Sequence, residues 1–188
     1  MRPQKWGGLG GGSAVSLGTF RDTNVTVTDM PAIFTTDALS QFLPGSWTIR
    51  ATNFPFWLNG DRVNGVLNYE LKSVSPLVFG DLVTYNKPDG TEKRIAGMDK
   101  YTGESFVWRG NGMLKLLASH WAVTGASDDL NVLAIQYQKS LVTPAGIDII
   151  VREGHTADEA RSLVALRTDQ FGLSAEQFAS LTWLPTHK

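Results

Sequence analysis

Short runs of apolar and β-branched residues, separated by turn signals, fill the sequence from residue 46 to residue 153. The joints between the runs contain Pro, Gly or Asp, which favour tight hairpins, and Lys87-Pro88-Asp89-Gly90 is one example. This pattern predicts an all-β fold in which each strand runs antiparallel to the next. The predicted strands cover residues 46–53, 63–74, 77–86, 91–100, 104–110, 113–125, 131–140 and 146–153.

A sheet with this many strands would leave two long edges free to pair with other chains, and closure into a barrel removes both edges. We therefore predict an eight-stranded antiparallel up-and-down β-barrel. A barrel of about eight strands has an interior just wide enough to hold one small ligand. The fold thus predicts a cup for a small molecule.

Residues 1–42 form a Gly-rich N-terminal extension, with six glycines between Gly7 and Gly18. Because glycine loses the most conformational freedom on ordering, we expect this extension to be flexible and able to act as a lid. Within it, alternation at residues 25–28 suggests a short strand, and Thr36 is placed to cap a short helix over residues 36–43.

Residues 43–188 contain the barrel and two helices that follow it. The capping box Thr156–Glu159, followed by apolar residues at helical spacing, predicts a helix packed against the outside of the barrel. A second capping box begins at Ser174 and predicts a shorter helix.

Charge and hydropathy narrow the range of partners. The 188 residues include 17 Lys and Arg scattered among 18 Asp and Glu, with a formal net charge of −1. Without a basic surface we expect no nucleic acid as a partner, and no segment is apolar enough to predict membrane insertion. The predicted partner is a hydrophobic small molecule, bound by a monomer or a homodimer.

Cysteine is absent, which excludes disulfides, thiol nucleophiles and thiolate metal ligands. The N-terminus has glycines where a signal peptide needs a continuous apolar segment, so we expect a cytoplasmic protein.

Gly45-Ser46-Trp47, at the start of the first predicted strand, resembles the G-x-W signature of lipocalins. Arg152, in the last predicted strand, resembles the arginine that lies across this tryptophan in that family. The resemblance covers residues 43–172 and implies a calyx whose closed end is built from Gly45, Trp47 and Arg152. An arginine stacked on a tryptophan is worth about 0.5 to 2 kcal/mol. The resemblance also implies that the long joint 54–62 folds over the open end.

Aromatic residues are the main candidates for the wall of a cavity. Side-chain alternation places Tyr69 on one face of the second predicted strand, and Phe79, Asp81, Val83 and Tyr85 on one face of the third. The predicted ligand-binding residues are Tyr69, Phe79, Tyr85, Trp108 and Trp121, and the predicted lid residues are Trp6, Phe54, Phe56 and Trp57. The alternative interpretation is that these rings fill a solid core.

No catalytic or metal-binding motif is present in the sequence. His120, His155 and His187 lack the spacing of a metal site, and no serine lies in a G-x-S-x-G elbow. We therefore expect neither a metal nor a cofactor.

The main prediction for the function is cyclisation of a bound substrate. The chain resembles lipocalin-like bacterial barrels of polyketide and spirotetramate biosynthesis, which catalyse Diels–Alder-type cycloaddition. This resemblance implies an enzyme that works by holding its substrate in a reactive shape. Gln136, Tyr137 and His120 are the predicted hydrogen-bond donors to a substrate carbonyl.

Two alternative functions involve no catalysis. A carrier would bind a hydrophobic ligand in the barrel and release it unchanged, stabilised by about 25 cal/mol per Å² of buried apolar surface. A structural barrel would have an interior filled by its own side chains.

Overall fold

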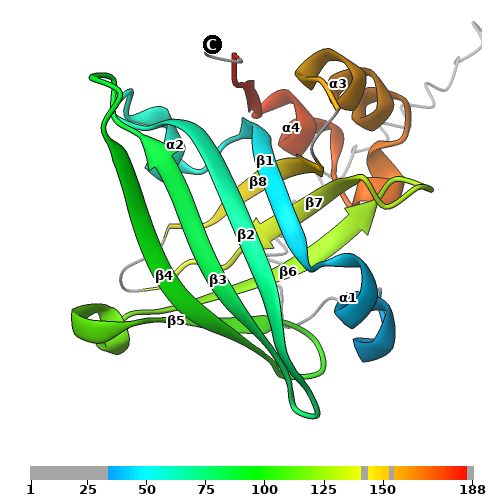
Figure 1. The fold of residues 1–188 in the computed structure, drawn as a ribbon. Helices are drawn as coiled ribbons and strands as arrows, with labels where there is room; N and C mark the ends of the chain where they lie inside the picture. The colour runs from blue at the N-terminus through cyan, green and yellow to red at the C-terminus, as the bar shows by residue number, and fades with distance from the viewer. Residues whose placement is uncertain (1–33, 141–143, 153–154, 186–188) are drawn as a thin grey trace, which may run out of the picture.

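The computed structural model describes residues 34–140, 144–152 and 155–185. Each of eight successive strands pairs antiparallel with the next, and the last returns to pair with the first, which closes the barrel (Figure 1). The predicted all-β, eight-stranded, up-and-down barrel is confirmed. The strands are β1 (Gly45–Thr52), β2 (Val63–Val74), β3 (Leu77–Asn86), β4 (Glu92–Tyr101), β5 (Phe106–Gly110), β6 (Ala118–Ala126), β7 (Val132–Tyr137) and β8 (Gly146–Arg152).

Helices precede, interrupt and follow the barrel. Before it lies α1 (Thr36–Phe42), and between β1 and β2 lies α2 (Pro55–Leu58). After β8 come α3 (Ala157–Leu166), the 3₁₀ helix η3 (Thr168–Phe171), α4 (Ala175–Ala179) and the short strand β9 (Thr182–Trp183), which pairs with β1. Both predicted capping boxes form, one at Thr156 and one at Ser174.

Two of the boundaries that differ from the predictions have a clear local cause. Thr35, not Thr36, caps α1, because its hydroxyl accepts a hydrogen bond from the Ala38 N–H at 3.2 Å. The predicted strand 113–125 begins only at Ala118, since residues 112–116 form the 3₁₀ helix η2 (Gly112–Leu116). Gly112 has a φ of +60°, a left-handed conformation that interrupts an extended run.

The strands separate an inner core from an outer one. Inward side chains pack around Trp47, Phe79 and Phe106. Outward side chains of β1, β7 and β8 pack against α3 and the residues that follow it, including Val164 and Phe171. The C-terminal helices therefore cover one outer face of the barrel, as predicted (Figure 1).

The closed end of the barrel is built around Trp47, which is fully buried. Trp47 pairs with Arg152 across β1 and β8, and the guanidinium carbon lies 4.3 Å from the centre of the indole ring. Arg152 also donates hydrogen bonds to the carbonyls of Phe42 and Pro44. Gly45 has a φ of +120°, and a Cβ there would lie 3.0 Å from the Arg152 guanidinium. The G-x-W spacing thus provides a ring for Arg152 and room beside it.

The predicted short strand 25–28 and the extension residue Trp6 lie outside the described residues. None of the helices in the described ranges is long and apolar enough to cross a membrane.

Candidate ligand-binding cavity

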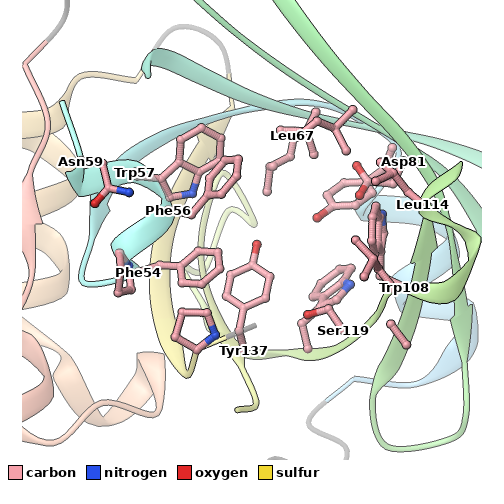
Figure 2. A pocket seen from close by; sticks show the side chains of 18 residues that line it. Phe54, Phe56, Trp57, Asn59, Leu67, Asp81, Trp108, Leu114, Ser119 and Tyr137 are labelled. Atoms are coloured by element: carbon pink, nitrogen blue, oxygen red, sulfur yellow. The ribbon is translucent and has the colours of Figure 1, made fainter. Parts of the chain in front are cut away.

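The barrel contains a cavity of about 470 Å³, which the α2 segment lines on one side. Figure 2 shows its side chains facing a common space, with Phe54, Phe56 and Trp57 opposite Asp81 and Trp108. Most of the wall is aromatic or aliphatic. The lining residues are Phe54, Pro55, Phe56, Trp57, Asn59, Leu67, Tyr69, Asp81, Val83, Ile95, Trp108, Leu114, Leu117, Ala118, Ser119, Trp121, Tyr137 and Pro144.

A stack of aromatic rings forms the floor of the cavity. Tyr69 lies over Trp121 with 5.5 Å between ring centres, and Trp121 lies over Phe106 at 4.5 Å. Phe79 packs against Phe106 beneath them and is fully buried. Aromatic side chains therefore fill the part of the barrel around Phe79 and Phe106, as in a solid core. The part beside the α2 segment is hollow.

The α2 segment lies across the mouth because its rings find partners on the wall. Phe54 stacks on Tyr137 at 4.9 Å, and Phe56 meets Trp57 edge-on at 4.7 Å. Arg62 covers the outer side of Phe56, with its guanidinium carbon 4.1 Å from the ring centre. These contacts place three of the four predicted lid residues on the cavity wall.

Asp148 anchors this segment from the opposite strand. Its carboxylate accepts hydrogen bonds from the Thr52 hydroxyl at 2.5 Å and from Trp57 Nε1 at 3.2 Å, and Tyr137 is a third hydrogen-bond partner. Burial raises the pKa of Asp148 to about 7, against the effect of these three partners, which favour the ionised form. A buried carboxylate with this many donors is a structural tie between β8 and α2.

Two further acidic residues, Asp81 on β3 and Asp99 on β4, are buried in the interior of the barrel. Trp108 donates a hydrogen bond to Asp81, and burial raises the pKa of Asp81 to about 7. Trp121 Nε1 donates to Asp99 at 2.7 Å. Burial, together with the neighbouring Asp81, raises the pKa of Asp99 well above its usual range. Near neutral pH the pair therefore retains protons that exposed carboxyls would lose.

The structure distributes the predicted ligand-binding residues over three positions. Tyr69, Trp108 and Trp121 line the cavity. Phe79 lies beneath the floor, and Tyr85 packs behind the α2 segment, 6.1 Å from the ring of Phe56 and 6.2 Å from that of Trp57. Phe79 and Tyr85 thus support the wall without forming it.

Of the three predicted hydrogen-bond donors, only Tyr137 lines the cavity. Tyr137 and Gln136 are neighbours on one strand, so their side chains point to opposite faces. Gln136 donates to the Gly172 carbonyl at 3.2 Å on the outer face, and the prediction that it reaches the cavity is wrong. His120 lies between the inward-facing Ser119 and Trp121, and its side chain therefore also points outward.

The sequence placed Asp81 on the inward face of the third predicted strand, but none of the three interior acidic residues was predicted to belong to the site. Asp81 stood among inward-facing positions of the third predicted strand, and Asp148 stands within the apolar run Ile147–Val151. A carboxyl at an inward position of a strand is a signal in itself, because an unpaired buried charge is costly. Asp99 gave no such signal, because it stands between Met98 and Lys100 near the end of its strand and not within an apolar run.

Within the described ranges, no group of three or more acidic or His side chains is placed to hold a metal ion. The cavity therefore offers shape, hydrophobic surface and a few hydrogen-bonding groups.

Comparison with solved structures identifies the architecture. Lobster apocrustacyanin A1 superposes with a TM-score of 0.55 at 12% identity, covering 89% of this chain and 94% of that one. Apocrustacyanin C2 gives a TM-score of 0.54 at 13% identity, with 77% of each chain covered. The fold is a lipocalin fold. The siderocalin Ex-FABP, which functions through dual ligand specificities, matches this lipocalin fold with a TM-score of 0.50 at 15% identity, covering 79% of this chain and 97% of that one.

No protein-family model matches the sequence, and no curated protein matches it either. The lipocalin likeness is therefore one of fold, with the G-x-W tripeptide and Arg152 as its sequence trace.

Proposed function

We propose that this protein binds a small hydrophobic molecule inside its barrel. The observation that carries the proposal is the cavity of about 470 Å³, whose wall is largely aromatic and aliphatic. Pockets of this size and character are typical of small-molecule sites. A similar structure whose function rests on ligand specificities, the siderocalin Ex-FABP, supports the same interpretation.

A fluorescent hydrophobe tests the proposal directly. The neutral dye N-phenyl-1-naphthylamine should bind with one-to-one stoichiometry and become brighter as it leaves water. Ile95→Trp adds bulk at a position that lines the cavity, and it should abolish binding.

Ala96→Trp is the matched control, because Ala96 is the next residue of β4 and is exposed on the outer face. It should leave dye binding unchanged. Equal binding by both variants, with folding confirmed by circular dichroism, would place the dye outside the barrel and overturn the proposal.

A second candidate is cyclisation of the bound molecule, of the Diels–Alder type. The observation that favours it is the raised pKa of Asp81, about 7, in an apolar cavity. A neutral carboxyl in such a site can donate a hydrogen bond to a substrate carbonyl, which polarises a dienophile. Enclosure by the α2 segment would supply the reactive shape.

Incubation with linear polyenes that carry a diene and an activated alkene separates the two candidates. A cyclase returns an isomer of equal mass that has lost diene absorbance, and Asp81→Asn slows its formation. A carrier returns the polyene unchanged. The lid role predicted for the extension is tested in the same assay by removing residues 1–18, since an unchanged dye affinity and rate would contradict it.

A further inference from the structure

Three buried oxygen atoms at one end of the cavity have no hydrogen-bond partner among the described residues. They are Asp81 Oδ1, Asp99 Oδ2 and Ser119 Oγ. Asp81 and Ser119 line the cavity, and both residues are 8% exposed, while Asp99 is fully buried behind Trp121. Buried polar atoms are almost always paired, because an unpaired one costs free energy. We call Asp81, Asp99 and Ser119 the acidic wall.

Strand register brings the acidic wall together. Asp81 lies opposite Gly97 and Phe79 opposite Asp99, so the two carboxyls are diagonal neighbours on β3 and β4. Trp108 lies opposite both Asp99 and Ser119. A Cβ at Gly97 would lie 2.3 Å from Trp108 Nε1, so this glycine lets the indole cross the sheet towards Asp81. Figure 2 shows Asp81, Trp108 and Ser119 on one side of the cavity.

The missing partner has a defined chemistry. A carboxylate oxygen accepts hydrogen bonds, and the indoles of Trp108 and Trp121 already donate to one oxygen each of Asp81 and Asp99. The residues that line the cavity include Asp81 and Ser119 of this wall but, within the described chain, no Lys, Arg or His. The described residues therefore supply no cation to this end of the cavity, and the group that complements the ionised form of these carboxyls is a donor with positive charge.

The surrounding rings favour an organic cation. Tyr69, Trp108 and Trp121 line the cavity beside the acidic wall, and the face of an aromatic ring attracts a cationic nitrogen. No described group of three acidic or His residues could hold a metal ion. The rest of the cavity wall is largely apolar, with Asn59 and the Tyr137 hydroxyl as its other polar groups within the described chain.

We propose that the ligand is an amphipathic amine, whose protonated nitrogen lies between Asp81 and Ser119 and whose apolar body fills the cavity towards α2. This proposal rests on the proposed function and specifies its ligand class. A proton shared between Asp81 and Asp99 would pair the two carboxyls without a ligand, but it would leave Ser119 Oγ unpaired. The two arrangements differ in what they predict for binding.

A matched series of ten-carbon chains tests the proposal by displacement of the neutral dye. Decylamine, decanol and decanoic acid differ only in the head group. At neutral pH decylamine should bind at least ten times more tightly than decanol, and decanoic acid should bind most weakly. Equal affinity for the amine and the alcohol would overturn the amine proposal while leaving the hydrophobic site intact.

Variants locate the head group. Asp81→Asn should reduce decylamine affinity at least tenfold and change decanol affinity by less than threefold. Ser119→Ala should reduce decylamine affinity about threefold. Glu70→Gln is the control, because it removes the same charge from an exposed side chain of the adjacent strand β2, and it should have no effect.

The failures of the two proposals are distinguishable. If the dye itself does not bind, the proposed hydrophobic site is wrong. If the dye binds and Asp81→Asn keeps the full preference for decylamine, the acidic wall does not recognise the amine and only the further proposal falls. Circular dichroism and urea unfolding of each variant confirm that the comparison is between folded proteins.

Discussion

Arg152 ties three parts of the closed end together. It lies over the indole of Trp47 and donates to the carbonyls of Phe42 and Pro44, which belong to the segment that leads from α1 into β1. Charge-assisted hydrogen bonds of this kind exceed neutral ones in strength, and the stacked ring adds a cation–π contribution. Both depend on Gly45 leaving room for the guanidinium.

Replacement of Arg152 therefore measures the worth of the closed end. Arg152→Met keeps an apolar side chain over Trp47 but loses the charge and both hydrogen bonds, and we expect the free energy of unfolding to fall by about 2 to 4 kcal/mol. Urea unfolding measures the change. Arg94→Met is the control, since Arg94 is exposed and its ion-pair partner among the described residues is Glu92 on the same strand. Equal midpoints for the two variants would contradict this role.

Asp81 makes the stability of the barrel depend on pH. Burial raises its pKa from 3.8 in an exposed group to about 7 in the folded state. The folded protein therefore holds a proton that the unfolded chain has lost between these values, and stability falls as the pH rises from about 4 to about 7. For a shift of this size the fall is on the order of 4 kcal/mol. Asp148, with a pKa also raised to about 7, acts in the same direction.

Unfolding in urea at about pH 5 and about pH 7.5 tests this dependence. The titratable groups that face Asp81 are Asp99 on β4 and Tyr69 on β2. The pKa of each is raised, mainly by burial and in addition by the charge of Asp81. Asp81→Asn should stabilise the protein at the higher pH and reduce the difference between the two midpoints. A difference that is the same in the variant would show that Asp81 does not cause it.

At the scale of elements, α2 is the part of the fold that shapes the cavity. It is a four-residue helix, too short to be stable alone, and it keeps its place through Trp57, which is 6% exposed. Trp57 fits against β2 because residue 65 is glycine: a Cβ there would lie 2.8 Å from the indole and 3.1 Å from Ile49 Cδ1. A small residue on a strand thus determines where the mouth segment lies.

Gly65→Ala should displace α2 from the mouth. We expect a loss of about 1 to 3 kcal/mol of stability, since a rigid ring must move, together with weaker dye binding and a red shift of tryptophan emission. Gly80→Ala is the matched control, because its Cβ would meet only the flexible end of Lys72, at 2.9 Å. If both variants bind the dye as the parent does, α2 does not depend on this contact.

The strands could be predicted from the sequence because each has its own turn signals, whereas the segments between them could not. The run at 113–117 is apolar and reads as strand, yet Met113 and Leu116 are almost fully exposed in η2. Its conformation is determined by Gly112 and by the bond from the Leu117 N–H to the Leu114 carbonyl, which periodicity does not reveal. The resemblance to lipocalins identified Phe54–Arg62 as a loop that folds over the open end, but its helix α2 was not predicted.

For the molecule as a whole, the sequence predicts the barrel better than it predicts the arrangement of the side chains inside it. The alternation of β2 and β3 placed Tyr69 correctly on the wall, and the G-x-W resemblance identified the closed end. The donors were harder to place, because one step along a strand reverses a side chain: Gln136 and His120 both face outward. How far down the barrel is filled depends on ring packing among Tyr69, Phe106 and Trp121, which comes from four different hairpin registers and not from any local pattern.

The buried carboxyls in the interior lower the stability of the barrel. A core that buries two neighbouring carboxyls beside an open cavity gives up stability that apolar residues would supply. Proteins commonly give up stability in this way at functional sites. The central feature of the molecule is the contrast between the part of the barrel that aromatic side chains fill and the largely apolar cavity, with Asp81 and Ser119 on its wall.

Native mass spectrometry of the protein purified without detergent tests this account most directly. We predict a one-to-one complex with a small organic molecule, retained from the producing cells or taken up from added decylamine. The complex should be lost in Ile95→Trp and kept in Ala96→Trp. If Ile95→Trp, folded as the parent is, retains the same molecule to the same extent, or if the parent binds neither a cellular molecule nor any added hydrophobe, then the cavity is not a ligand site.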